Sequence, residues 1–71
     1  MTLNEAVKTL QDMKPIIKAS YNTRKWVDVE HVPVDRVILL ALESYGLVDV
    51  KAGLRSNTVF RAKAAAIKAV E

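Results

Sequence analysis

The chain has 71 residues, of which 51% are hydrophobic and 27% are charged, and its formal net charge at pH 7 is +3. A chain of this length forms one domain, residues 1–71, with a thin margin of stability, because a small domain leaves much of its surface in water. The absence of cysteine excludes disulfides and thiolate metal sites, and His31 as the only histidine excludes a histidine-rich metal cluster.

Residues 1–13 predict an amphipathic helix. Thr2 and Glu5 have the spacing of a capping box, and apolar residues follow them at helical spacing. Pro15 interrupts the pattern, since it removes a backbone hydrogen bond and clashes with the preceding turn. We expect a kink there, or a break followed by a short second turn through Ala19.

The same N-terminal segment bears on localisation. It is mixed in charge and lacks the basic end and apolar run of a signal peptide. No stretch of the sequence has the run of about 18 apolar residues that a membrane-spanning helix needs. We expect a cytoplasmic protein with no contact to a membrane.

Residues 20–23 predict a loop. Residues 25–30 alternate and are rich in β-branched side chains, which is typical of a short strand. The same stretch is also compatible with an extended lead into one helical turn at residues 28–31.

Trp26 is the only tryptophan, and we interpret it as a core anchor. The alternative is that it stacks beside phosphates held by the neighbouring Arg24 and Lys25. Asp28 and Glu30 are two carboxylates on one side of the possible strand, a pattern that acid–base chemistry can use. Without further ligands, a helix cap is the better interpretation of Asp28.

Residues 33–45 give the strongest helix signal. Pro33 has the φ favoured at a first helical position, and Gly46 stands where a left-handed C′ residue would end the helix. Leu39 and Leu40 extend the apolar surface around the helix, and we interpret them as a partner interface, in a homodimer that would stabilise this small fold. The alternative is that the terminal helices cover them. One face of this helix is expected to be core: Val37, Ile38, Ala41 and Leu42.

Residues 47–51 and 59–62 predict two strands, joined by a loop at residues 53–57. Gly53 and Asn57 can take positive φ in that loop.

Alternation along the second strand turns Phe60 toward the core and Arg61 outward. Residues 63–71 predict a C-terminal helix by propensity.

Charge is unevenly distributed along the chain. Residues 14–25 hold four cations and no acid, residues 26–50 hold one cation against five acids, and residues 51–71 hold five cations against one acid. If the two basic segments meet in space, they form a cationic face.

The order helix, short strand or turn, helix, hairpin and tail resembles a winged helix-turn-helix domain. The residues that carry this resemblance are Leu42, Gly46, Leu47 and Val48, followed by Thr58, Val59, Phe60 and Arg61, and it covers residues 25–62 best. The resemblance implies an α+β fold with helices packed on a short β-hairpin. It also implies a helix in the major groove of DNA and a basic wing on the phosphate backbone.

The sequence departs from that family at two points. Only residues 28–32 are available for the helix that should precede the recognition helix. The helix at residues 33–45 offers acids and leucines where a DNA-reading helix offers Arg, Lys, Asn, Gln, Ser or Thr to base edges.

The leading hypothesis is a small DNA-binding protein, a transcriptional regulator or accessory factor, that holds the DNA backbone through its basic edges. Lys51, Arg55 and Arg61 of the hairpin are the main candidates, and Ser56 or Asn57 could reach a base or sugar. Further phosphate contacts are expected from Arg24, Lys25 and Arg36. The alternative for the hairpin is a solvated closure of the fold, in which charges protect strand edges.

A second hypothesis is a protein-interaction module or inhibitor that uses the apolar face of helix 33–45 and binds no DNA. We expect no enzyme and no cofactor, because the sequence has no Gly-rich phosphate loop and no Ser-His-Asp arrangement that its spacing supports.

Overall fold

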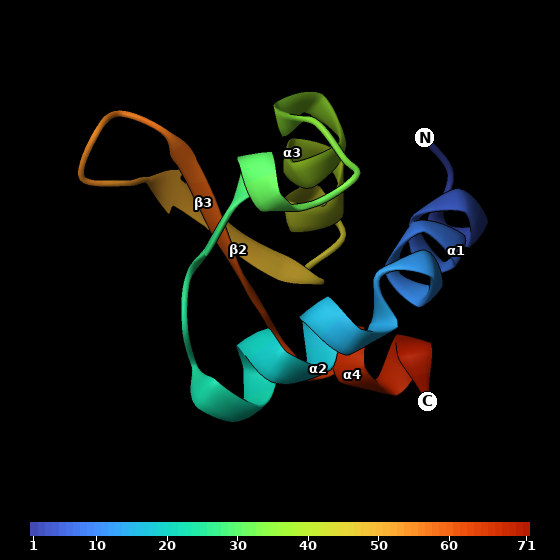
Figure 1. Cartoon of the computed structure of the whole chain (residues 1–71). Helices are drawn as coiled ribbons and strands as arrows, with labels where there is room; N and C mark the ends of the chain where they lie inside the picture. Colours follow the sequence, from blue (N-terminus) through green and yellow to red (C-terminus); the bar gives the residue numbers. More distant parts are fainter.

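The computed structural model describes all residues from Met1 to Glu71 and has an α+β fold, as the sequence predicts. Helices surround the base of a β-hairpin whose loop projects away from them (Figure 1). The elements in chain order are α1 (Leu3–Asp12), α2 (Lys14–Thr23), β1 (Val27–Asp28), the 3₁₀ turn η1 (Val29–His31), α3 (Arg36–Ser44), β2 (Val48–Ala52), β3 (Thr58–Ala62) and α4 (Ala64–Val70).

The three strands form one antiparallel sheet in the order β1-β3-β2. Phe60 of β3 lies opposite both Val27 of β1 and Val50 of β2, so these three side chains share a face. That face is covered by the helices, with α3 against β2, α2 against β3, and α1 beside α4 (Figure 1). Phe60 is fully buried there, which confirms the inward orientation predicted for it.

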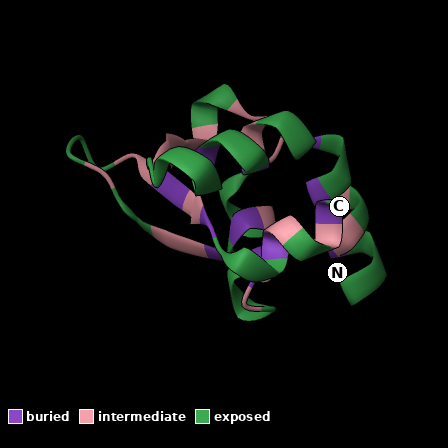
Figure 2. Cartoon of the chain, turned by 90° about the horizontal axis from the view of Figure 1, so that it is seen from below, coloured by how far each residue is buried: buried purple, intermediate pink, exposed green.

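The core lies at the base of the hairpin, where the helices converge, and the hairpin loop is exposed (Figure 2). It draws on every helix and on both long strands. Its buried members are Ala6, Leu10, Met13, Ile17, Leu39, Leu42, Leu47, Val48, Phe60, Ala62, Ala66 and Val70.

The N-terminal helix begins as predicted. The Thr2 hydroxyl accepts from the Glu5 N–H at 3.2 Å, and the Thr2 N–H donates to the Glu5 carboxylate at 3.3 Å, which completes the capping box. At Pro15 the chain breaks rather than kinks: α1 ends at Asp12, and Pro15 stands in the first turn of α2. Its missing N–H costs nothing there, because the first N–H groups of a helix have no intrahelical partner.

The loop predicted at residues 20–23 is wrong, because these residues form the last turn of α2. The buried Ser20 hydroxyl donates to the Lys25 carbonyl at 3.0 Å and accepts from the Ala62 N–H at 3.2 Å. A serine that reads as a loop residue therefore serves as a buried link between α2 and β3. The helix ends at Arg24, whose φ of 55° is left-handed.

Helix α3 starts three residues later than predicted. Residues 32–34 are not helical, and the Asp35 carboxylate caps the helix by accepting from the Ile38 N–H at 2.9 Å. At the other end, Gly46 has a φ of 74° and is the C′ residue, as predicted. Its N–H donates to Glu43 and that of Leu47 donates to Leu42, the two hydrogen bonds of a Schellman motif.

The face of α3 that packs inward differs from the prediction. Leu39 is fully buried in the core of the single chain, so its interpretation as part of a partner interface is wrong. Val37, expected in the core, is 74% exposed. Leu40 is 43% exposed, in agreement with an outward position. The error follows from the run Val37 to Leu42, in which apolar residues occupy every position and leave the helical phase undefined.

The hairpin loop is closed by the Gly53 N–H, which donates to the Asn57 carbonyl at 2.6 Å. Neither Gly53 nor Asn57 has the positive φ predicted for it. A Cβ at Gly53 would meet the Asn57 side-chain oxygen at 2.5 Å, whereas the positive φ of this loop, 60°, belongs to Ser56. The Asn57 side-chain amide donates to the Asp28 carboxylate, which ties the loop to the strand β1.

Candidate nucleic-acid interface

The face of the sheet that the helices leave uncovered carries charged side chains. Because side chains alternate along a strand, the neighbours of the inward-facing Phe60 point to this outer face. Asp28, Val59 and Lys51 lie opposite one another across the three strands, and Arg61 lies opposite Asp49 in the next row. The outward orientation predicted for Arg61 is confirmed.

Trp26, one residue before β1, lies at the centre of this face. The Lys51 ammonium is 4.0 Å from the centre of its ring, and the Arg61 guanidinium carbon is 4.6 Å from it. Trp26 is half-buried and lies outside the core cluster, so its interpretation as a core anchor is wrong. Two cations from two strands instead share its ring, which fixes their positions by cation–π attraction.

Two open clefts flank this centre. The first, of about 530 Å³, lies beneath the hairpin loop and is lined by Trp26, Lys51 and Arg55 together with Ala52, Gly53, Leu54, Asn57 and Val59. Lys51 and Arg55 of the hairpin therefore share this cleft with the ring of Trp26.

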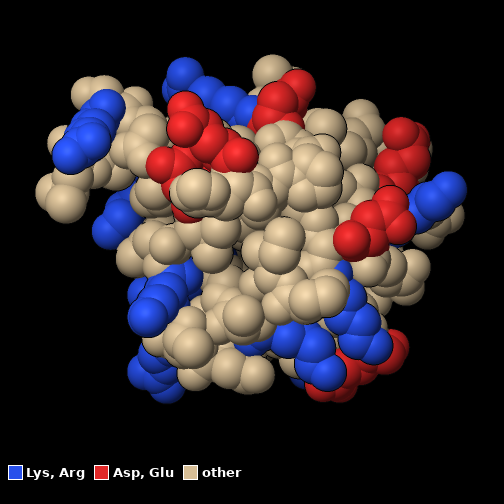
Figure 3. All heavy atoms as spheres, in the orientation of Figure 1, with Lys and Arg blue, Asp and Glu red and all other residues tan.

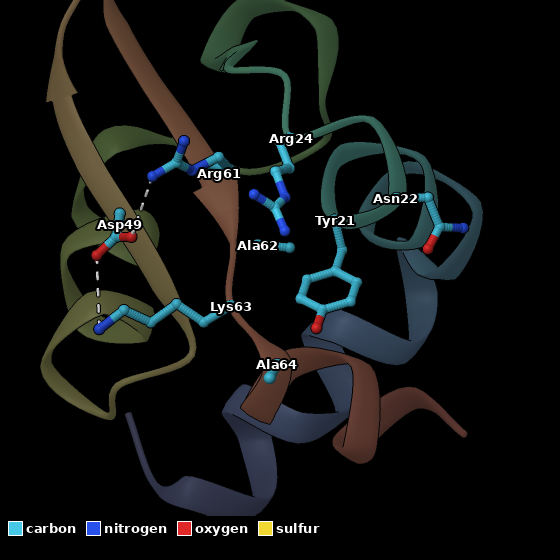
Figure 4. Close-up of a pocket in the computed structure, with 8 residues that line it drawn as sticks. All are labelled: Tyr21, Asn22, Arg24, Asp49, Arg61, Ala62, Lys63 and Ala64. Atoms are coloured by element: carbon cyan, nitrogen blue, oxygen red, sulfur yellow. Dashed lines mark ion pairs between the residues drawn. The ribbon is translucent and has the colours of Figure 1, made fainter.

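The second cleft, of about 500 Å³, lies between α2 and β3. Arg24 extends into it between Arg61 and the ring of Tyr21, whereas Asn22 points away (Figure 4). The Asp49 carboxylate is 3.5 Å from the Lys63 ammonium and 4.0 Å from the Arg61 guanidinium. This cleft contains one acid against three cations.

The Asp28 carboxylate ties the hairpin loop to β1. It accepts from the Glu30 N–H at 3.0 Å and from the Asn57 amide. Both hydrogen bonds favour the charged form and lower the pKa of Asp28, the Glu30 bond more strongly. The cap predicted at Asp28 is confirmed, and Asp28 also anchors the hairpin.

Some predicted contact residues lie elsewhere. Arg36 and Ser56 line a cleft on the α3 side of the hairpin, which Lys51 lines too and Trp26 does not. Lys25 lines a hollow beside α2 that it shares with Trp26 and Asp28. One N–H of the Asn57 side-chain amide donates to Asp28, which ties this side chain to β1.

Two residues of the site were not predicted as contacts. Lys63 directly follows β3 and turns into the Asp49 cleft, and Tyr21 faces it from α2. Alternation continued by two residues past Arg61 would have indicated Lys63. No local signal indicates Tyr21, because its place depends on how α2 packs on β3.

The two basic segments of the sequence meet in space. In Figure 3, a run of Lys and Arg atoms follows the edge of the molecule from the hairpin loop down toward α2, while Asp and Glu atoms lie mainly toward the top and right. Two acids of the middle segment make hydrogen bonds within the chain. Glu43 accepts from the Val50 N–H at 3.1 Å on the open edge of β2, and Asp35 caps α3.

In comparisons with known proteins, no family model, no curated sequence and no solved structure matched this chain. None of its helices is long and apolar enough to cross a membrane. The assignment of a function therefore rests on the geometry and charge of the outer face.

Proposed function

We propose that this protein binds DNA and holds its phosphate backbone with the outer face of the sheet and the hairpin, which acts as a wing. The observation that carries the proposal is the convergence of Lys51 and Arg61 on the Trp26 ring, with Arg24 beside Arg61 in one flanking cleft and Arg55 lining the other. Residues far apart in the sequence thus form one cationic surface, and a polyanion is the partner that such a surface favours.

The element order supports a winged-helix interpretation of this binding. A short strand, one tight turn, a helix and a hairpin follow one another as the sequence resemblance requires. The helix before α3 is reduced to the three residues of η1. Its partner helix α3 presents Val37 and Leu40 to solvent, which suits neither base edges nor phosphates. The proposal therefore assigns DNA to the sheet face and the hairpin, with modest sequence specificity.

Arg55→Glu tests the wing. Arg55 is exposed on the hairpin loop, so the substitution should leave the melting temperature nearly unchanged. Because a favourable phosphate contact becomes a repulsive one, we expect affinity for a labelled random-sequence duplex to fall by about tenfold or more. Lys68→Glu on α4 makes the same change of charge far from the site and is the control. Equal losses in both variants would mean that net charge alone attracts DNA.

A second candidate function is protein binding or self-association through α3. Val37 and Leu40 are its exposed apolar side chains, and Leu39 no longer belongs to this surface. Leu40→Asp should convert a dimer to a monomer in sedimentation analysis if this face is a dimer interface. A wild-type protein that is monomeric at all concentrations removes this candidate as a homodimer.

A further inference from the structure

The cleft between α2 and β3 has a more specific composition than a general cationic surface. Its three cations, Arg24, Arg61 and Lys63, come from the end of α2, from β3 and from the residue after β3. Asp49 is the only acid among its lining residues, so the cleft carries a net charge of +2. Its volume of about 500 Å³ falls within the range of small-molecule sites.

Arg24 is the cation without an internal partner. Arg61 and Lys63 pair with Asp49, but Arg24 makes no ion pair. Its left-handed φ of 55° is unusual for a residue other than glycine, asparagine or aspartate. This backbone conformation turns the chain from α2 toward β1 and places the guanidinium in the cleft between Arg61 and Tyr21 (Figure 4).

The two ion pairs of the cleft are weak enough to be exchanged. The Lys63 and Arg61 side chains are 45% and 37% exposed, and Asp49 is 43% exposed. Ion pairs in contact with water contribute little, so an incoming anion can replace Asp49 as the partner of either cation. The exposed ring of Tyr21 forms a wall against which a sugar or base can lie.

We infer that this cleft binds a phosphomonoester dianion, carried either by the end of a nucleic-acid strand or by a free nucleotide. A terminal phosphate carries a charge of about −1.5 to −2 at neutral pH, which matches the net charge of the cleft, whereas an internal phosphodiester carries a single charge. The guanidinium groups of Arg24 and Arg61 offer planar donors to its oxygens, and Lys63 adds a point charge. The inference rests on the proposed function, because it names a group that the same surface takes.

The fluorescence of Trp26 provides the first test, since Arg61 touches both the cleft and the Trp26 ring. The probes are a deoxynucleoside 5′-monophosphate, inorganic phosphate and the corresponding nucleoside. We expect saturable changes with the first two and none with the nucleoside. Arg24→Gly keeps the left-handed backbone without strain and should lower the affinity for the monophosphate by about tenfold. Lys8→Ala on α1 removes the same charge elsewhere and should leave the affinity unchanged.

Duplexes labelled at a 3′ end, with 5′ ends either phosphorylated or free, separate this inference from the proposed function. We expect several-fold tighter binding of the phosphorylated duplex, and loss of that preference in Arg24→Gly. If both duplexes bind equally and the monophosphate causes no change, the inference is overturned while DNA binding stands. If the monophosphate binds as described but neither duplex does, the cleft is a nucleotide phosphate site and the proposed function fails. Equal weakening by Arg24→Gly and Lys8→Ala also overturns the inference.

Discussion

At the scale of single residues, the geometry of the site depends on polar side chains that hold the backbone in place. Asp28 bonds the Asn57 amide and the Glu30 N–H. Ser20 bonds the Lys25 carbonyl and the Ala62 N–H. These two residues fix the hairpin and the Arg24 turn relative to β1 and β3. The spacing of the cations on the outer face is thus set by two residues that carry no positive charge.

The link through Asp28 predicts an acid-sensitive hairpin. Hydrogen bonds from Glu30 and Asn57 lower the pKa of Asp28 below its ordinary value of 3.8. The charged form is therefore favoured in the folded state. Its contribution to the free energy of unfolding is fully present above 3.8 and is lost as the pH falls through the lower, folded pKa.

Urea denaturation at a series of pH values measures this link. The wild type should lose stability on acidification to below pH 3.8 more steeply than Asp28→Asn, which carries no titrating group at that position. Asp12→Asn, which changes an exposed carboxylate on α1, should keep the wild-type slope. Identical slopes for wild type and Asp28→Asn would contradict the assigned role of Asp28.

At the scale of elements, the sequence predicted the type of nearly every helix and strand, and it failed where packing decides. Gly46, the Thr2 capping box and Phe60 each carry a local signal that the structure confirms. No local signal defines which side of α3 faces the core, because every residue from Val37 to Leu42 is apolar. Which of them is buried depends on the angle at which α3 crosses β2.

The corrected phase of α3 predicts a large loss of stability at one leucine and a small change at its neighbour. Leu39 is fully buried, so Leu39→Ala should lower the free energy of unfolding by about 2–5 kcal/mol through lost burial and the cavity left behind. Leu40 is 43% exposed, so Leu40→Ala should change it by about 0.5 kcal/mol at most. Thermal denaturation of both variants gives the comparison, and a larger loss at Leu40 would reverse the assignment.

The candidate site was predicted only in part, because some of its residues carry a local signal and others are placed by packing. Lys51, Arg55 and Arg61 lie together because strand alternation and a hairpin are local patterns that the sequence encodes. Trp26 and Tyr21 join them through the pairing of β1 with β3 and the packing of α2, which are long-range contacts. The use of Trp26 as a shared partner of two cations could not be predicted from its neighbours Arg24 and Lys25.

At the scale of the whole molecule, the fold separates an apolar helix surface from a cationic sheet surface. Every helix contributes to the core, and the sheet face opposite that core carries Asp49, Lys51 and Arg61, which line the two clefts. This division lets a domain of 71 residues keep a continuous core on one side of its sheet and leave the other side free for a partner.

The salt dependence of binding to a random-sequence duplex, followed by fluorescence anisotropy, tests the central claim most directly. Lys51, Arg55, Arg61 and Arg24 should each neutralise a phosphate, so the logarithm of the association constant should fall with that of the salt concentration with a slope of about −3 to −4. Arg55→Glu should make this slope shallower by about one unit. Absence of binding at low salt, or binding that does not weaken with salt, would contradict the assignment of the outer sheet face to DNA.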